Sequence, residues 1–188
     1  MDGPTQFALA YSLTTSAGLR GLLTLAVVSV AAHAGVLHPP MGFEWLGATP
    51  VTIALIVVAL VDLAADKIPV VDHAMHVLQV VVKPACAAIL VGGTLHPQSE
   101  SQLIALMALG IFNALGIHAV SAGVRGTSTA VSGGIANPFV STGEDVLAIV
   151  LSGLAFIAPF VAAACAIALT VVAVLSGRTL WRRLRRVR

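Results

Sequence analysis

A charged hexapeptide occurs twice in a chain whose residues are mostly apolar. Ser16-Ala17-Gly18-Leu19-Arg20-Gly21 returns as Ser121-Ala122-Gly123-Val124-Arg125-Gly126, with a single Leu to Val exchange. Each copy places an arginine in or beside an apolar run, where an unpaired charge costs from about 2.5 to over 10 kcal/mol in a membrane. Two interpretations follow. In the first, the two guanidinium groups contact an anion or form a pair that gates a pathway. In the second, they snorkel to the lipid headgroups.

Two carboxylates end the next apolar run. Asp62 and Asp66 are one helical turn apart, Lys67 is adjacent, and Pro69 stops the helix. Paired carboxylates in a low dielectric hold a proton or a cation, because ionising both is unfavourable. The alternative is a salt bridge from Asp66 or Lys67 that only closes the turn.

A polar stripe follows in the third apolar run. Asp72, His76, Gln79 and Lys83 lie at spacings of 4, 3 and 4, which places them on one helix face with His73 beside it. Such a face predicts contact with the protein interior or an aqueous cavity. A proton relay or a hydrogen-bonded stripe is favoured. A metal on Asp72, His73 and His76 is a weaker alternative, because no further ligand is evident.

The second half has its own polar stripe. His118, Ser121 and Arg125 share a face at spacings of 3 and 4, and a predicted loop from Gly126 to Asp145 follows. Either Ser141 or Thr142 caps a helix there with acids in its first turn, or the loop folds back and lines a cavity. The candidate pathway residues are therefore Arg20, Asp62, Asp66, Lys67, Asp72, His73, His76, Lys83, His118, Arg125, Asn137, Glu144 and Asp145.

The elements that carry these residues are predicted to be membrane helices. Hydrophobic residues make up 58%, charged residues 10%, and the mean hydropathy is +1.00, which excludes a soluble domain. The first apolar stretch is longer than the ~20 residues that a bilayer needs, so it is tilted or broken near Gly18 and Gly21. The predicted spans are 6–36, 49–66, 71–94, 101–124, 144–158 and 160–177. An alternative has five spans, with 146–175 as one helix and the N-terminus outside.

Each copy of the hexapeptide is followed by a loop, an apolar run, a proline and a second apolar run. Three spans per half force the halves into opposite orientations, so we predict one domain, 1–188, built from two inverted three-helix repeats. The first repeat covers about 6–95 and the second about 100–177. A basic tail, 178–188, follows and lies at the lipid headgroups rather than on nucleic acid.

The distribution of basic residues predicts the orientation. The loops 37–48 and 95–100 contain no Lys or Arg, whereas Lys67, Arg125 and the tail fall on the other side. The positive-inside rule then gives two cytoplasmic termini.

Several motifs resemble a bacterial integral-membrane family catalogued as domain of unknown function 4126. They are Ala17-Gly18-Leu19-Arg20, Trp45-Leu46, Asp66-Lys67-Ile68-Pro69, Val71-Asp72-His73, Lys83-Pro84, Gly116, His118-Ala119, Asn137-Pro138-Phe139, Ser141 and Glu144-Asp145. The resemblance covers most of the chain and implies a multi-pass protein of the bacterial inner membrane. It implies no established activity.

These features favour a small transporter or channel for a small ion or polar solute, with possible proton coupling and a pathway between the two repeats. The alternatives are a membrane-embedded enzyme acting on a lipid or quinone, and a structural or regulatory subunit. An enzyme is disfavoured, because neither a nucleophile elbow nor a HExxH motif is present. The sequence names no cofactor, and the expected partners are membrane lipids, the transported solute and a second copy in a homodimer.

Overall fold

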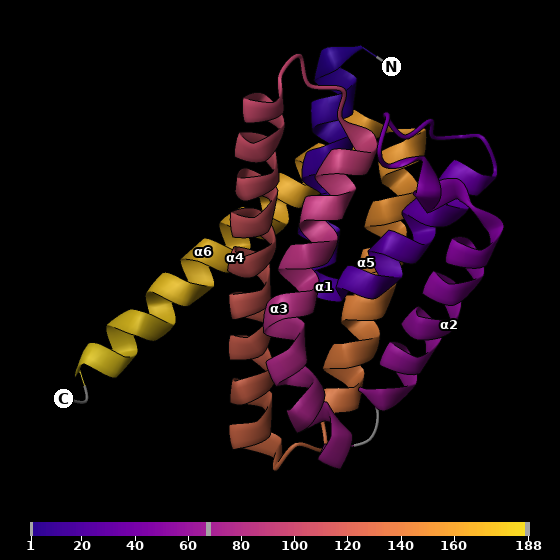
Figure 1. Cartoon of the computed structure of the whole chain (residues 1–188). Coiled ribbons are helices and arrows are strands. Elements are labelled where there is room, and N and C mark those ends of the chain that lie inside the picture. The colour runs from indigo at the N-terminus through magenta and orange to yellow at the C-terminus, as the bar shows by residue number, and fades with distance from the viewer. Residues whose placement is uncertain (1, 67–68, 187–188) are drawn as a thin grey trace.

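The computed structural model describes residues 2–66 and 69–186, with side chains for all of these except 69–77, 173 and 176–186. The described chain is helical apart from short connections (Figure 1). In chain order the elements are α1 (Gly3–His33), the 3-10 helix η1 (Glu44–Gly47), α2 (Thr49–Ala65), α3 (Pro69–Thr94), α4 (Glu100–Ser132), α5 (Asn137–Ile157) and α6 (Pro159–Arg186).

Three of the described helices, α1, α4 and α5, are long and apolar enough to cross a membrane. Shorter apolar helices cover Thr49–Ala65, Leu78–Thr94 and Pro159–Val172. Large hydrophobic side chains such as Val81, Phe112 and Ile157 are exposed on the outside of the bundle, as a lipid-facing surface requires. The all-helical prediction is confirmed, and the helices suggest a multi-pass membrane protein.

α1 is broken at its centre. Arg20 has φ −139° and ψ 86°, outside the helical region. Ser16 Oγ lies 2.8 Å from Thr24 Oγ1 across the break, although eight residues of straight helix would span about 12 Å. Of the two expected ways to accommodate the long first stretch, tilt or a break near Gly18 and Gly21, the structure has the break.

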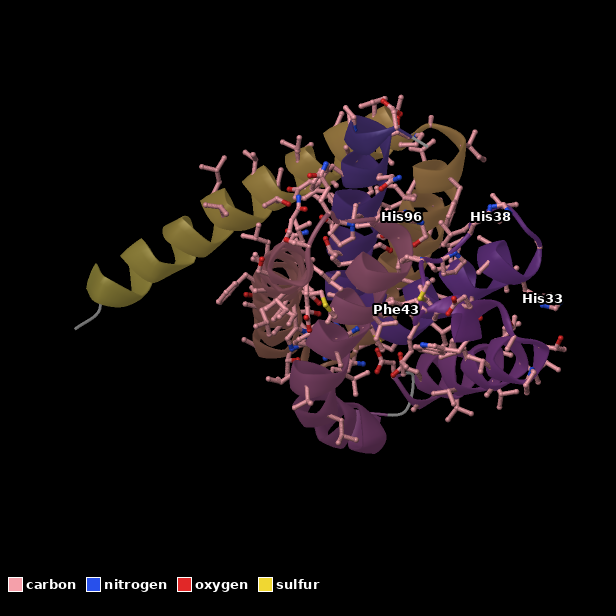
Figure 2. The ribbon with its side chains drawn as sticks, turned by 45° about the horizontal axis from the view of Figure 1, so that its top comes forward. His33, His38, Phe43 and His96 are labelled. Carbon is pink, nitrogen blue, oxygen red and sulfur yellow. The ribbon has the colours of Figure 1, made fainter. Side chains whose placement is uncertain are left out.

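The break turns the second arm of α1 back toward the end of the bundle from which the first arm came (Figure 1). Gln6, near the start of α1, and His38, just beyond its end, line one cavity of about 280 Å³ with Thr94 and His96. Gln6 Oε1 also accepts a hydrogen bond from the His96 backbone N–H at 3.2 Å. Figure 2 shows His38 and His96 at this same end of the molecule. The predicted span over 6–36 therefore consists of two arms that meet at Arg20.

Glycines on both sides of the break let α1 lie against its neighbours. A Cβ at Gly18 would lie 2.6 Å from Ile117 Cβ and 2.7 Å from the Ala114 carbonyl oxygen of α4. A Cβ at Gly21 would lie 3.1 Å from Lys83 Cα of α3. The apex of α1 is thus inserted between α3 and α4, in the middle of the bundle.

The two copies of the hexapeptide differ in structure. The first surrounds the break in α1, whereas the second lies within the uninterrupted helix α4, where Gly123 and Gly126 have open space at the Cβ position. α1 packs against all five other helices, while α4 packs mainly against α3 and α1. The described residues therefore show no structural repeat to match the sequence repeat.

The predicted loop from Gly126 to Asp145 is wrong. α4 continues to Ser132 and α5 begins at Asn137, so the connection is only 133–136, with φ values of +62° at Gly133 and +91° at Gly134. The hydroxyls of Thr127, Thr129 and Ser132 each donate to the backbone carbonyl four residues earlier, which lets these residues continue the helix. Neither Ser141 nor Thr142 caps a helix, because both lie inside α5.

The break predicted before Pro159 is present. Ala158 has φ −143° and ψ 73°, and it separates α5 from α6. The proline lacks a backbone N–H and cannot continue the preceding helix. The alternative of one long helix over 146–175 is therefore wrong.

Candidate functional site

The guanidinium group of Arg20 is fully buried at the break in α1. Its Nη1 donates to Asp66 Oδ2 at the end of α2, and its Nε lies 2.6 Å from Asp145 Oδ1 of α5. Its Nη2 donates to Ser141 Oγ at 2.6 Å and lies 3.8 Å from Glu144 Oε2. Arg20 therefore joins α1 to α2 and α5, and each of its three nitrogens makes one main contact. The interpretation that this side chain snorkels to the lipid headgroups is wrong.

Arg125, the arginine of the second hexapeptide, reaches the same carboxylates from α4. Its Nη2 lies 3.1 Å from Asp66 Oδ2 and 2.5 Å from Glu144 Oε2. Ser121, one turn earlier on α4, donates to Glu144 Oε1. The two arginines of the repeated motif thus converge on shared carboxylates rather than facing each other across an open gate, and Arg125 is also too buried to reach the headgroups.

A buried amine and imidazole lie beside these ion pairs. Lys83 Nζ of α3 is 3.1 Å from His118 Nδ1 of α4, and the two residues are 2% and 6% exposed. In its ammonium form Lys83 can only donate, and His118 Nδ1 then accepts. Lys83 also interacts electrostatically with Glu144, Arg20 and Arg125.

Asp62 and Gln79 complete the cluster on the side of α2 and α3. Gln79 Nε2 is 3.5 Å from Asp62 Oδ1 and 3.4 Å from Asp66 Oδ1. Both distances are at the long limit for hydrogen bonds, so the amide is held firmly by neither carboxylate. Asp62 and Gln79 are nevertheless buried, at 5% and 4% exposure.

The described cluster has more carboxylates than cations. Arg20, Lys83 and Arg125 stand against Asp62, Asp66, Glu144 and Asp145, which gives a formal charge of −1 with His118 neutral. Since both arginines are occupied by carboxylates, an anion would have to break ion pairs to bind them. The electrostatics of these side chains favour a proton or a cation over an anion.

Three buried hydroxyls hold the break in α1 against α5. Ser16 Oγ lies 2.8 Å from Thr24 Oγ1, 2.8 Å from Ser152 Oγ, and 3.0 Å from the Ala148 carbonyl oxygen to which it donates. Ser16, Thr24 and Ser152 are all fully buried. They supply hydrogen bonds where the helical pattern of α1 is interrupted.

A cavity of about 300 Å³ reaches the cluster from outside. Most of its lining is apolar, from α1, α4, α5 and α6, and its polar lining residues are Ser121 and Glu144. Leu147 and Val172, which also line it, are exposed on the outer surface. Glu144 is thus the carboxylate of the cluster that borders an accessible space.

Most of the predicted site residues meet in this cluster. The structure brings together Arg20, Asp62, Asp66, Lys83, His118, Arg125, Glu144 and Asp145. Asn137 does not join them, because its Nδ2 donates to Thr129 Oγ1 at 2.9 Å and ties the start of α5 to the end of α4. Lys67 and the side chains of Asp72, His73 and His76 lie outside the described residues.

The roles of two serines, Ser141 and Ser16, were not recognised from the sequence. Ser141 was interpreted as a helix cap but contacts Arg20, and the signal for this was its spacing of three residues from Glu144 on one helix face. Ser16 was noticed only as part of the repeat, and nothing in the sequence pairs it with Ser152. Among the side chains that the structure describes, no group of three His, Cys, Asp or Glu is arranged to hold a metal ion.

A comparison with protein families supports the resemblance seen in the motifs. The profile of the family described as "Domain of unknown function (DUF4126)" matches residues 7–179. The chain belongs to this family. The DUF4126 match includes all six helices at least in part and every described residue of the buried cluster. No curated protein and no solved structure matches the chain.

Proposed function

We propose that this DUF4126 protein is a small membrane transporter or channel for a small ion or polar solute, and that its pathway passes through the buried ionic cluster. The observation that carries the proposal is the placement of Arg20. A fully buried arginine lies at the apex of a broken apolar helix and is ion-paired to two other helices. Broken helices and buried charges in membrane proteins are typical of ion and solute pathways.

The cluster is bordered differently in two directions, which supports a pathway that reaches it. On the side of Glu144, a cavity of about 300 Å³ borders the cluster. On the side of the chain's N-terminus, the buried apolar residues Leu9, Leu13 and Leu90 lie along α1 and α3 between the cluster and the cavity of Gln6 and His38. The cluster therefore borders an accessible space at Glu144, whereas packed apolar side chains separate it from the cavity of Gln6 and His38.

The proposal modifies the pathway expected between two inverted repeats. The arginines of the two hexapeptides still meet at one place, the carboxyl groups of Asp66 and Glu144. The excess carboxylate favours a cation or a coupled proton as the transported charge. Membrane lipids and a second copy in a homodimer remain the expected partners.

The location proposed is the bacterial inner membrane, with a revised orientation. Because α1 folds back, the N-terminus lies at the same end of the bundle as 34–48 and 95–99 (Figure 1). These connections lack Lys and Arg. Lys67 comes just after the end of α2, and most of the basic tail forms the last part of α6; both helices run away from the end that holds the N-terminus (Figure 1). The positive-inside rule then gives an outside N-terminus and a cytoplasmic C-terminus, in place of two cytoplasmic termini.

Flux into proteoliposomes tests the function. Purified protein would be reconstituted with internal pH and membrane-potential dyes, and a panel of small cations, anions and polar solutes added outside. We expect a signal that Glu144→Gln abolishes and that Glu100→Gln, an exposed carboxylate at the start of α4, leaves unchanged. Silence across the panel from folded protein, or equal flux through both variants, would reject the cluster as a pathway.

A further inference from the structure

Asp62 stands apart from the other carboxylates of the cluster. Asp66, Glu144 and Asp145 each lie within 4 Å of an arginine nitrogen. Asp62 forms no ion pair with a described side chain, and the single hydrogen bond that its carboxylate accepts from the described residues comes from Gln79 Nε2 at 3.5 Å. A carboxylate that is only 5% exposed and forms no ion pair with a described side chain is destabilised in its charged form, which favours neutralisation.

Gln79 provides an independent observation at the same place, an unpartnered buried acceptor next to Asp62. Its Oε1 is buried and has no hydrogen-bond partner among the described atoms, while its Nε2 is shared at long distances between Asp62 and Asp66. A buried acceptor of this kind normally finds a donor. A proton on Asp62 converts that carboxyl from an acceptor into a donor, which an amide oxygen can accept once the Gln79 side chain turns.

Building on the proposed transport function, we propose that Asp62 is the carboxyl group that binds and releases the coupled proton, with the Gln79 amide as its hydrogen-bond partner in both states. Protonated Asp62 donates its O–H to Gln79 Oε1. Deprotonated Asp62 accepts from Gln79 Nε2, and the proton leaves to water admitted on the open side of the pathway. No other bond forms or breaks.

The surrounding groups bear on Asp62 from three helices. Asp66 of α2, Arg20 of α1 and Lys83 of α3 all interact electrostatically with Asp62. Cys86 of α3 is a further neighbour. The ion pairs of Asp66 keep its Oδ2 bound to Arg20 and Arg125, so Asp62 is the member of the carboxyl pair that is free to exchange a proton without breaking the cluster.

Infrared difference spectroscopy of the full protein in lipid tests this assignment directly. The C=O band of a protonated carboxylic acid would be followed as the pH is raised, without any transported solute present. We expect one band that disappears with pH in the wild type and is absent in Asp62→Asn, with Glu100→Gln as the matched control that retains it. Gln79→Leu should keep the band but shift its pH midpoint, because the partner of the acid is removed.

Several results would overturn the proposal. It fails if Asp62→Asn retains the band, or if no acid band is present in the wild type at any pH where the protein is folded. If Asp62→Asn does not fold, Asp62→Glu must shift the band, and an unmoved band counts against Asp62. A midpoint that moves with sodium but not with choline would assign the site to a metal cation instead. The band is measured without any solute. Its absence would therefore reject the role of Asp62 but would not bear on the transport function, which the flux assay tests independently.

Discussion

Replacing Arg20 by Gln tests whether the buried cluster holds the bundle together. The side chain is fully buried and joins α1 to Asp66 of α2 and to Asp145 and Ser141 of α5. Removing one partner of a buried ion pair destabilises a protein by about 3–5 kcal/mol, because the remaining charge is left in a low dielectric. Asp66 keeps its contact with Arg125 at 3.1 Å, whereas Asp145 loses its contact with Arg20 at 2.6 Å. We therefore expect about 3–5 kcal/mol for Arg20→Gln, which lowers the folded-to-unfolded ratio by roughly two to three and a half powers of ten.

The assay is equilibrium unfolding of the purified protein in mixed detergent and dodecyl sulfate micelles, followed by helical circular dichroism. Arg20→Lys should recover only part of the loss, because one ammonium cannot place separate donors on Asp66, Asp145 and Ser141. Glu100→Gln, at an exposed position, should change the unfolding free energy by no more than about 0.5 kcal/mol. A loss for Arg20→Gln as small as that of the control would refute the view that these ion pairs stabilise the fold.

Three further predictions follow from the packing and the orientation. Gly18→Ala should destabilise the protein by about 1–3 kcal/mol, because the added Cβ meets Ile117 and the Ala114 backbone, whereas Gly123→Ala, the same position of the second hexapeptide, should be close to neutral in the same unfolding assay. Equal effects of the two alanines would contradict the insertion of α1 against α4. Ser121→Ala should destabilise by about 1–3 kcal/mol, since Glu144 Oε1 loses its donor, and Ser101→Ala at an exposed site is the control. In a background of Cys86→Ala and Cys165→Ala, an impermeant maleimide added to whole cells should label Asp2→Cys and Met41→Cys but not Ile135→Cys. Labelling of Ile135→Cys in place of Asp2→Cys would reverse the proposed orientation.

The sequence was sufficient to predict the helices, because their signal is local. Apolar runs and the prolines at 50, 69, 138 and 159 mark most helix boundaries within a few residues. The exception is 126–145, where a high content of Gly, Ser and Thr predicted a loop. The hydroxyls there donate back to carbonyls of the same helix, and this option cannot be distinguished from a turn by composition alone.

The site was predictable as a set of residues but not as an arrangement. Charged side chains are so rare in this chain that each one inside an apolar run was a candidate, and eight of the thirteen candidates meet in the cluster. Their partners could not be predicted, because Arg20 and Asp145 are far apart in the sequence and come together only through the break in α1. The repeated hexapeptide pointed to equivalent halves. The same six residue types instead surround a break in one helix and continue another, because their neighbours differ.

The separation of Arg20 from its acidic partners has a consequence for how the chain is made. When α1 emerges from the ribosome, its central arginine has no counter-charge, since Asp66 follows 46 residues later and Asp145 125 residues later. A charge of this kind is unfavourable in lipid until it is paired. Asp66 of α2 supplies the first counter-charge, and the contact of Arg20 with Asp145 forms only after α5 has been synthesised. The first helix of this protein therefore completes its ion pairs only when residues near the other end of the chain have been made.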